Sequence, residues 1–226
     1  MKGFINSQQD SLFGHKDIIG FGDDSFNIQL IDRDKANKII VKNHYSGKFY
    51  AASKHHFGLF SGNVLKGVLQ FGCAMNPASF ASVVAGTKED EYLELNRMWI
   101  CDSMPRNTES RSISYCIKVL RRICPNLAWI QSFADERCGR NGVVYQAANF
   151  DYVGEHTSTF WELEGQVYHN SLMTRNPELS KSAKYLIENK DRASASEYRQ
   201  FRYIYFLKKS FKKRLNYTIQ PYPKHN

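Results

Sequence analysis

Short stretches in which apolar and polar residues alternate run through much of the chain, and this period of two is typical of strands with one buried face. A turn at 61–63, Ser-Gly-Asn, joins two of these stretches into a predicted hairpin. The predicted strands cover residues 27–31, 56–60, 64–71, 92–100, 127–134, 152–154, 159–163, 167–169 and 201–207.

Helices are predicted where apolar residues recur every three or four positions. Three of them lie at 32–46, at 142–149 and after Pro177. The clearest helix begins near Thr108 or Ser110 and ends before Pro125. Its expected buried face consists of Ile113, Cys116, Ile117 and Leu120.

The predicted elements follow the order β-α-β-β-loop-β-α-β-α-β-β, which favours an α/β chain with one mixed sheet flanked by helices. This is the element order of the GCN5-related acyltransferase (GNAT) fold, although order alone does not establish an activity. We expect one GNAT-like domain at 27–207, preceded by a poorly ordered lead-in at 1–26. A basic and loose C-terminal tail at 208–226 is expected to follow it.

The net charge of the chain suggests a binding partner. The 226 residues carry 31 lysines and arginines against 22 aspartates and glutamates, a formal net charge of +9. Most of the excess lies at 192–214, where aromatic residues are interspersed among the basic ones. Such runs are most often solvated surface, but basic charge mixed with rings also suits a polyanion, so we expect a nucleic acid as partner. The residues assigned to it are Lys48, Arg202, Lys208, Lys209, Lys212, Lys213 and Arg214.

Other compositional signals argue against several classes of protein. The five cysteines are scattered without a C-x-x-C pair, so neither a disulfide framework nor a zinc knuckle is expected. The histidines show no metal-binding spacing, so no metal ligands are assigned. Because no apolar run could cross a bilayer and the polar N-terminus lacks a secretory signal, we expect a soluble intracellular protein.

Arg97 stands out in the predicted strand 92–100. Strict alternation puts it in one row with Leu93, Leu95 and Trp99, and an arginine among apolar residues needs an anionic partner. A structural salt bridge and an anion-binding role explain it equally well.

Three further side chains are candidates for the site. Asp135 directly follows the predicted strand 127–134, at the strand end where α/β proteins bind ligands, although a loop aspartate is the commoner case. Tyr145 lies in a short helix, where packing is the commoner role. His44 ends the first helix, and a lone histidine is usually a packing residue as well.

Familiar catalytic motifs are missing from the chain. It has no nucleophile elbow, Walker loop or dinucleotide fingerprint, and no acyl-CoA loop of the form Gln/Arg-x-x-Gly-x-Gly/Ala after the strand 92–100. In place of that loop, the segment 101–111 offers a helix start with hydroxyl groups and two arginines, which suits an anion. We assign Arg97, Ser110 and Arg111 to binding the donor of a transferred group.

Six separated strings, read together, resemble the Mom proteins, the DNA-modification proteins of phage Mu and its relatives. They are HYSGK at 44–48, GVLQFG at 67–72, ELNRM at 94–98, SFAD at 132–135, YQAANF at 145–150 and RYIYF at 202–206. The resemblance implies a GNAT-like fold, a location in the cytoplasm of a bacterial host, and conversion of adenine in double-stranded DNA to N6-carbamoylmethyladenine, which protects phage DNA from restriction. The site positions that it implies are His44, Tyr45, Arg97, Ser110, Asp135 and Tyr145.

Roles for these residues follow as hypotheses. Asp135 would accept the N6 proton, and Tyr145 would donate to a leaving group or oxyanion. Arg97 and the helix start at Ser110 would bind phosphate, while His44 and Tyr45 would contact the flipped base.

The donor of the transferred group is predicted from atom count. A glycyl group carries the two carbons and the nitrogen that the product needs, so glycyl-tRNA is favoured as co-substrate, with acetyl-CoA as the alternative. Two other functions stay open, an N-acetyltransferase acting on a protein or small amine and a non-catalytic nucleic-acid-binding protein. The sequence does not decide between a monomer and a dimer.

Overall fold

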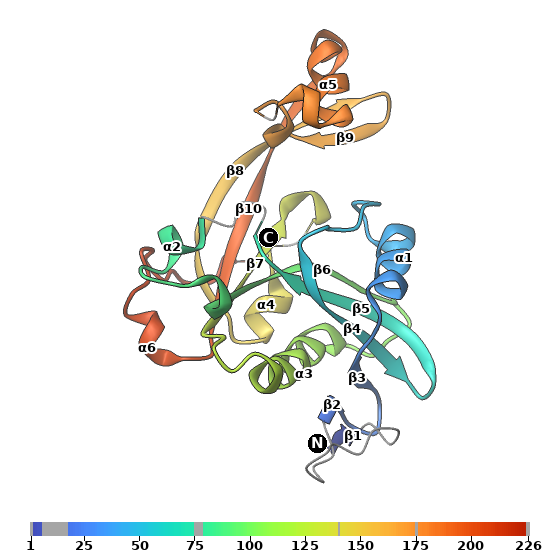
Figure 1. Cartoon of the computed structure of the whole chain (residues 1–226), viewed down its shortest axis with the longest axis vertical. Helices are drawn as coiled ribbons and strands as arrows, with labels where there is room; N and C mark the ends of the chain where they lie inside the picture. Colours follow the sequence, from blue (N-terminus) through green and yellow to red (C-terminus); the bar gives the residue numbers. More distant parts are fainter. Residues whose placement is uncertain (1, 6–17, 75–78, 140, 175, 225–226) are drawn as a thin grey trace.

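The computed structural model describes residues 2–5, 18–74, 79–139, 141–174 and 176–224. Within them the chain forms a mixed sheet of ten strands in the order β1-β2-β3-β4-β5-β6-β7-β10-β8-β9, flanked by helices (Figure 1). The strands are β1 (Lys2–Ile5), β2 (Ile18–Gly22), β3 (Asn27–Leu30), β4 (Ser53–Ser61), β5 (Val64–Gly72), β6 (Tyr92–Ile100), β7 (Trp129–Asp135), β8 (Asp151–Leu163), β9 (Gln166–His169) and β10 (Ser194–Phe206). The helices are α1 (Arg33–Asn43), α2 (Phe80–Val83), α3 (Thr108–Ile123), α4 (Val143–Ala147), α5 (Lys181–Glu188) and α6 (Lys209–Lys212).

Apolar side chains on both faces hold this sheet between helices. On one face α3 and α4 pack against β3 to β7 and β10 through the largest buried cluster. The four residues that predicted α3 from the sequence all lie in that cluster, which confirms the helix. On the other face α1 covers Val68 and Trp99, while α2 and α6 cover Trp129 and Ile204. The α/β class with a mixed, helix-flanked sheet is therefore confirmed.

The parallel pair β6 and β7 is the place where the sheet opens. The two strands share only the pairs Tyr92–Trp129, Leu93–Ile130 and Glu94–Gln131, although each continues for several residues. Their carboxyl halves pair instead with β5 and β10 on either side. The two strands therefore separate toward their carboxyl ends and leave a gap between them.

A long two-stranded arm rises from this body. β8 and β10 have 13 residues each, and the half of β10 from Ser194 to Arg199 pairs with β8 alone. Figure 1 shows the arm leaving the body, with β9 and α5 at its far end. A small apolar cluster around Leu163, Tyr168 and Leu186 holds the tip together. The sequence predicted two short strands in place of β8 and placed the start of β10 seven residues too late.

The expectations for both chain ends need correction. β2 belongs to the sheet and pairs with β3, so the lead-in is not loose over Ile18–Gly22, while residues 6–17 lie outside the described part. Gly20 makes this close pairing possible, because a Cβ there would lie 2.1 Å from the carbonyl oxygen of Ile28. Beyond Leu207 the tail packs on the body through α6 and its buried Phe211. The loose tail was therefore a wrong prediction.

Most aromatic residues interspersed with the basic run serve the core. Phe201 and Tyr203 are buried in the cluster under α3 and α4, and Phe211 is buried on the opposite face. Alternation along β10 thus sends its rings into the two apolar layers. They are not available to stack on a polyanion.

Candidate functional site

A cavity of about 730 Å³ occupies the gap between the separated ends of β6 and β7, and we call it the carboxyl-end cavity. Its walls come from the loop after α1, the second half of β6, the loop leading into α3, the end of β7 and α4. Open α/β sheets bind ligands at this edge, where strand ends and helix starts expose unpaired polar groups. The volume falls in the usual range for small-molecule sites.

The six residues predicted as a site meet in this cavity. They come from five separate segments spread over about a hundred residues of sequence. The lining includes His44, Tyr45, Arg97, Ser110, Asp135 and Tyr145.

Asp135 ends β7 and is held as an ionised carboxylate. It is only 8% exposed, and it accepts hydrogen bonds from the Arg137 backbone nitrogen and from Arg137 Nε, both at 3.0 Å. An ion pair with the same guanidinium completes the contact. Burial by itself would raise the pKa of Asp135, but the Arg137 hydrogen bonds outweigh burial and lower it.

Tyr45 and His44 form the wall opposite Asp135. The Tyr45 hydroxyl donates to Asp135 Oδ2 at 3.4 Å, while the residue as a whole is 61% exposed. The two rings lie 4.2 Å apart. His44 Nδ1 accepts the backbone N–H of Ser46 at 3.2 Å, so in the neutral ring the proton is on Nε2. Burial, then the Arg97 charge, lower the pKa of His44 to about 4, which keeps it neutral at pH 7.

Arg97 reaches the cavity because of a bulge in β6. Gln70 pairs with Arg97 and Phe71 with Leu95, so Asn96 is an extra residue that reverses the side-chain alternation. Leu95 therefore packs in the cluster under α3, whereas Arg97 faces away from that cluster and lies over the ring of Tyr50. The single row predicted from strict alternation was wrong.

The Arg97 guanidinium contacts neutral groups. Its Nε donates to the Lys48 carbonyl at 3.3 Å and a terminal nitrogen donates to the Asn96 carbonyl at 2.7 Å. Within the part of the chain that the structure describes, no carboxylate lies within 4.0 Å of it. A half-buried cation fixed by backbone carbonyls is suited to bind an anionic ligand.

Tyr145 approaches the cavity from α4. Burial raises the pKa of its hydroxyl to about 12, with Ser132 as hydrogen-bonding partner. Its ring lies 5.4 Å from Tyr203 and 5.7 Å from Phe150, which fixes its orientation. At neutral pH the hydroxyl is protonated and can donate a hydrogen bond.

The start of α3 forms the remaining wall, with Ser110 7% exposed and donating to the Asn107 carbonyl at 3.2 Å. Arg111, in contrast, does not line this cavity. Its guanidinium pairs with Asp23 and lies 4.7 Å from the centre of the Phe26 ring, which anchors the segment between β2 and β3. The structure therefore separates Arg111 from the other residues assigned to donor binding.

This wall does not fit the pyrophosphate of an acyl-CoA. Pro105 has no N–H to offer, and the carboxylates of Asp102 and Glu109 line the same part of the cavity. Arg106 is the one cation that the loop contributes to the lining.

With this geometry in place, the comparisons with known proteins identify the family. The model of the Mom protein family matches residues 25–224. The chain belongs to this family. It is also 50% identical over 210 residues to the methylcarbamoylase mom of Escherichia phage Mu, covering 92% of this chain and 87% of that protein.

Solved structures resemble this Mom-family protein more distantly. A ribosomal-protein-S5-alanine acetyltransferase from Vibrio fischeri is 10% identical with a TM-score of 0.48, over 83% of this chain and 96% of that one. An N-acetyltransferase from Staphylococcus aureus Mu50 is 10% identical with a TM-score of 0.46, over 80% and 97%.

Several residues that line the cavity could not be recognised in the sequence. Arg137 pairs with Asp135 and its guanidinium lies 3.6 Å from the centre of the Phe160 ring in β8, so the arm is tied to the site. Cys138 and Phe133 also line the cavity. The one usable signal was the run Asp-Glu-Arg-Cys directly after a buried strand.

The predicted nucleic-acid contacts are distributed unevenly. Lys48 lies 5.3 Å from the Tyr168 ring at the arm's tip, and Arg202 lies between Phe133 and Tyr217. Three of the tail's cations have partners within the protein. Lys208 donates to the Asn126 carbonyl, Lys212 pairs with Asp151, and Arg214 lies 3.8 Å from the Phe211 ring centre.

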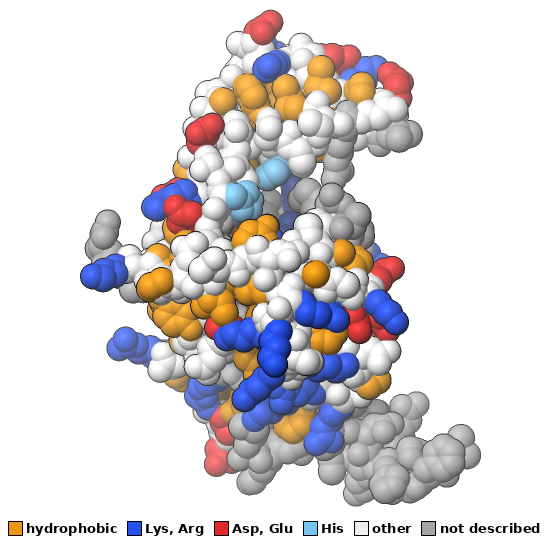
Figure 2. All heavy atoms as spheres, turned by 90° about the vertical axis from the view of Figure 1, so that its left-hand side faces the viewer, with side chains coloured by type: hydrophobic (Ala, Val, Ile, Leu, Met, Phe, Trp, Pro, Cys, Tyr) orange, Lys and Arg blue, Asp and Glu red, His pale blue; other side chains and the backbone are white. Residues whose placement is uncertain are grey.

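Exposed basic side chains nonetheless gather on one face. Figure 2 shows them clustered on the side of the molecule that carries α2 and α6. Lys209 and Lys213 are exposed there. This face remains a predicted polyanion surface.

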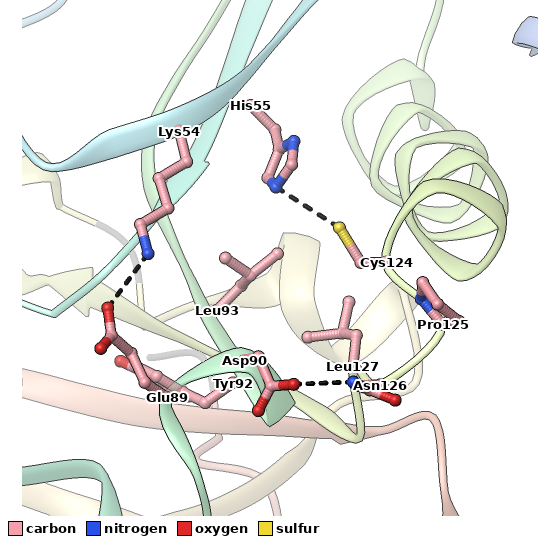
Figure 3. Close-up of a pocket in the computed structure, with 10 residues that line it drawn as sticks. All are labelled: Lys54, His55, Glu89, Asp90, Tyr92, Leu93, Cys124, Pro125, Asn126 and Leu127. Carbon is pink, nitrogen blue, oxygen red and sulfur yellow. Dashed lines mark hydrogen bonds and ion pairs between the residues drawn. The ribbon is translucent and has the colours of Figure 1, made fainter.

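A second, smaller hollow of about 240 Å³ lies at the other end of the same strands, and we call it the amino-end hollow (Figure 3). Its polar side chains are paired with one another: Lys54 with Glu89 at 3.3 Å, Asn126 with Asp90 at 2.7 Å and Cys124 with His55 at 3.4 Å. Burial raises the pKa of Cys124, which disfavours the thiolate.

The described residues form neither a metal-binding cluster nor a membrane-spanning helix. Among residues 2–5, 18–74, 79–139, 141–174 and 176–224, no three His, Cys, Asp or Glu side chains are placed to hold a metal ion. In the same part of the chain, no helix has the length and apolar character needed to span a membrane.

Proposed function

We propose that this protein is a transferase that converts adenine in double-stranded DNA to N6-carbamoylmethyladenine, and that it acts in the cytoplasm of an infected bacterium to protect phage DNA from restriction. One observation carries the proposal: the six residues singled out from the sequence all line one cavity of about 730 Å³. Membership of the Mom family and the methylcarbamoylase of phage Mu support the same chemistry.

The cavity suits a base that has left the helix. Adenine N6 is inaccessible in a stacked duplex, so an enzyme that modifies it must flip the nucleotide outward. Tyr45, an exposed residue beside the neutral His44 ring, offers an aromatic surface to such a base. A flipped base resting there would have its amino group within reach of Asp135.

Asp135 is proposed to accept a hydrogen bond from N6 and then its proton. The lone pair of N6 is delocalised into the ring, so the nitrogen is a weak nucleophile until it is oriented. Once N6 has attacked a carbonyl carbon it becomes strongly acidic. A carboxylate whose pKa is lowered by Arg137 can still receive that proton.

Tyr145 and Arg97 are proposed to act on the donor side. The protonated Tyr145 hydroxyl would donate to the developing oxyanion or to the departing oxygen. Arg97, with backbone carbonyls as its partners, would bind a phosphate, with Ser110 beside it in the lining of the cavity.

The favoured donor is glycyl-tRNA. Attack of N6 on the glycyl ester forms the N6–carbonyl bond, breaks the ester C–O bond and returns the proton to the tRNA hydroxyl. The product, N6-glycyladenine, is an isomer of the final base. Neither Pro105 nor the carboxylates of Asp102 and Glu109 favour a CoA pyrophosphate.

A rearrangement completes the proposed reaction. The free glycyl amine attacks C6 through a five-membered ring, the bond from C6 to the original N6 breaks, and that nitrogen leaves as a carboxamide with one added proton. Adenine then carries NH-CH2-CO-NH2. Atoms balance without an oxidant or a reductant.

The decisive experiment is mass spectrometry of nucleosides from the DNA of three cell samples. They express the unaltered protein, the Asp135→Asn variant or the Asp90→Asn variant. We expect a carbamoylmethyl deoxyadenosine with the unaltered protein and with Asp90→Asn, and at least 100-fold less of it with Asp135→Asn. Asp90 lies in the amino-end hollow and is the matched control. Activity of folded Asp135→Asn would contradict the assignment of the proton acceptor.

A reaction with purified protein distinguishes the two candidate donors. DNA is incubated with glycyl-tRNA carrying labelled glycine or with acetyl-CoA. Label in deoxyadenosine is the expected result, whereas modification supported by acetyl-CoA without tRNA would overturn the glycyl donor.

A further inference from the structure

One side-chain cluster beside the carboxyl-end cavity has no role in the chemistry above. It consists of Phe133, His156, Arg202 and Tyr217, which we call the strip. Phe133 comes from β7, His156 from β8, Arg202 from β10 and Tyr217 from the C-terminal tail. Four distant segments are thus brought together on one face of the sheet.

Cation–π and edge-to-face contacts hold the strip together. The Arg202 guanidinium lies 5.0 Å from the centre of the Phe133 ring and 4.9 Å from that of Tyr217, and the rings of Phe133 and His156 meet edge to face at 5.6 Å. Among the residues that the structure describes, no carboxylate lies within 4.0 Å of Arg202. Its positive charge is therefore held by rings, which leaves it able to attract an anion.

The strip continues directly into the cavity. Phe133 and Asp135 are two positions apart on β7, so their side chains point to the same face, about 7 Å apart along the strand. Phe133 itself lines the cavity. A ligand that filled the cavity next to Asp135 could therefore extend onto the strip.

Solvent reaches the strip at His156, which is exposed. The arm rises past the strip toward its tip, and Figure 2 shows histidine side chains in the recess between the tip and the body. The clustered lysines and arginines lie below the recess in the same view. Tyr217, at 40% exposure, is accessible from solvent.

We propose that the strip binds an unstacked nucleotide that flanks the target adenine in the same DNA strand. The proposal rests on the proposed function, because it takes the adenine in the cavity as its reference. Rings beside an arginine without a carboxylate partner form the combination that holds single-stranded bases by stacking and their phosphates by charge. Flipping one adenine unstacks its neighbour, and the strip supplies a replacement surface for that neighbour.

Tyr217 offers the cleanest test, because it is exposed and lies outside the core. Duplexes are made in which the target is the only adenine and 2-aminopurine replaces the base on one side or the other. We expect Tyr217→Leu to weaken binding about tenfold, from the loss of one stacked base, and to change the aminopurine fluorescence of the bound duplex. Tyr217→Phe keeps the ring and should bind as the unaltered protein does.

Tyr222→Leu is the matched control, since Tyr222 is another exposed tyrosine of the same tail, at 46% exposure. Arg202→Lys and Arg199→Lys form a second pair. Both keep the charge, but Arg199 already pairs with Glu136, so only Arg202→Lys should lose affinity. Equal binding by Tyr217→Leu and the unaltered protein would overturn the proposal.

Binding and fluorescence require no chemistry, so the two proposals fail separately. DNA that binds through Tyr217 but yields no modified nucleoside would refute the proposed function and support the strip. Modified DNA whose binding and fluorescence are insensitive to Tyr217→Leu would refute the strip alone.

Discussion

The carboxyl-end cavity and the amino-end hollow are walled by the same two strands, β6 and β7, but they pair their charges differently. In the hollow, Lys54 contacts Glu89 and Asn126 contacts Asp90, so polar groups satisfy one another. In the cavity, within the part of the chain that the structure describes, the Arg97 guanidinium donates its hydrogen bonds to two backbone carbonyls. The hollow is thus complete without a ligand, whereas the cavity has a charge left for one.

The topology of the sheet accounts for this difference. At their amino ends β6 and β7 are paired, so the hollow lies beside a closed sheet. At their carboxyl ends the strands have separated, and the bulge at Asn96 turns Arg97 out of the apolar layer. Strand separation creates the carboxyl-end cavity, and the bulge places the Arg97 guanidinium at its edge.

Removing one cation from each region, in separate variants, gives the largest expected difference in reaction rate. Arg97→Ala removes a cation that has no carboxylate partner, and it should slow DNA modification by roughly 100-fold, the usual cost of misplacing a bound donor. Lys54→Ala removes a solvent-exposed charge that already has a partner and should change the rate by less than about twofold. The rates are measured with purified proteins whose circular dichroism spectra match. Equal losses in the two variants would show that charge pairing does not distinguish the regions.

The sequence predicted the elements whose residues face one apolar layer throughout. α3 was found because its apolar positions repeat with helical spacing and all of them are buried. β8 was split in two because its centre, at 155–157, is exposed and polar, and only its pairing with β10 keeps it extended. Because the arm does not pack on an apolar layer, its sequence need not alternate between apolar and polar residues.

The site divides along the same line. Strings of residues identified Asp135 and Tyr145, and both line the cavity. The bulge that redirects Arg97 depends on pairing with β5, and the contact of Arg137 with Asp135 depends on the turn after β7. Neither the bulge nor this contact produces a repeating pattern of apolar and polar residues that could be recognised in the sequence. Arg111 looked equivalent to Arg97 until the fold gave it Asp23 as partner.

Histidines in the two regions give a smaller, pH-dependent effect. Since the pKa of His44 is lowered to about 4, the folded protein leaves this ring neutral between pH 6.5 and 4 while the unfolded chain protonates it. Folding stability should therefore fall as the pH drops through this window, and His44→Gln should lose less stability than the unaltered protein over it. Chemical denaturation at a series of pH values measures this.

His55 in the hollow is the control for function. Burial lowers its pKa as well, so His55→Gln should also flatten the stability curve. Only His44→Gln should alter the modification rate at neutral pH. A normal rate for His44→Gln would remove His44 from contact with the flipped base.

The smallest expected effect concerns the thiols of the two regions. Cys138 is exposed and lines the cavity, whereas Cys124 contacts His55 in the hollow and has a pKa raised by burial. Iodoacetamide should therefore label Cys138 before Cys124, as read from peptide masses. Bound duplex DNA should slow the labelling of Cys138 several-fold and leave the rate at Cys124 unchanged, because only the cavity is covered. If DNA protected both thiols equally, the substrate would reach both ends of β6 and β7, and the assignment of binding to the carboxyl ends alone would fail.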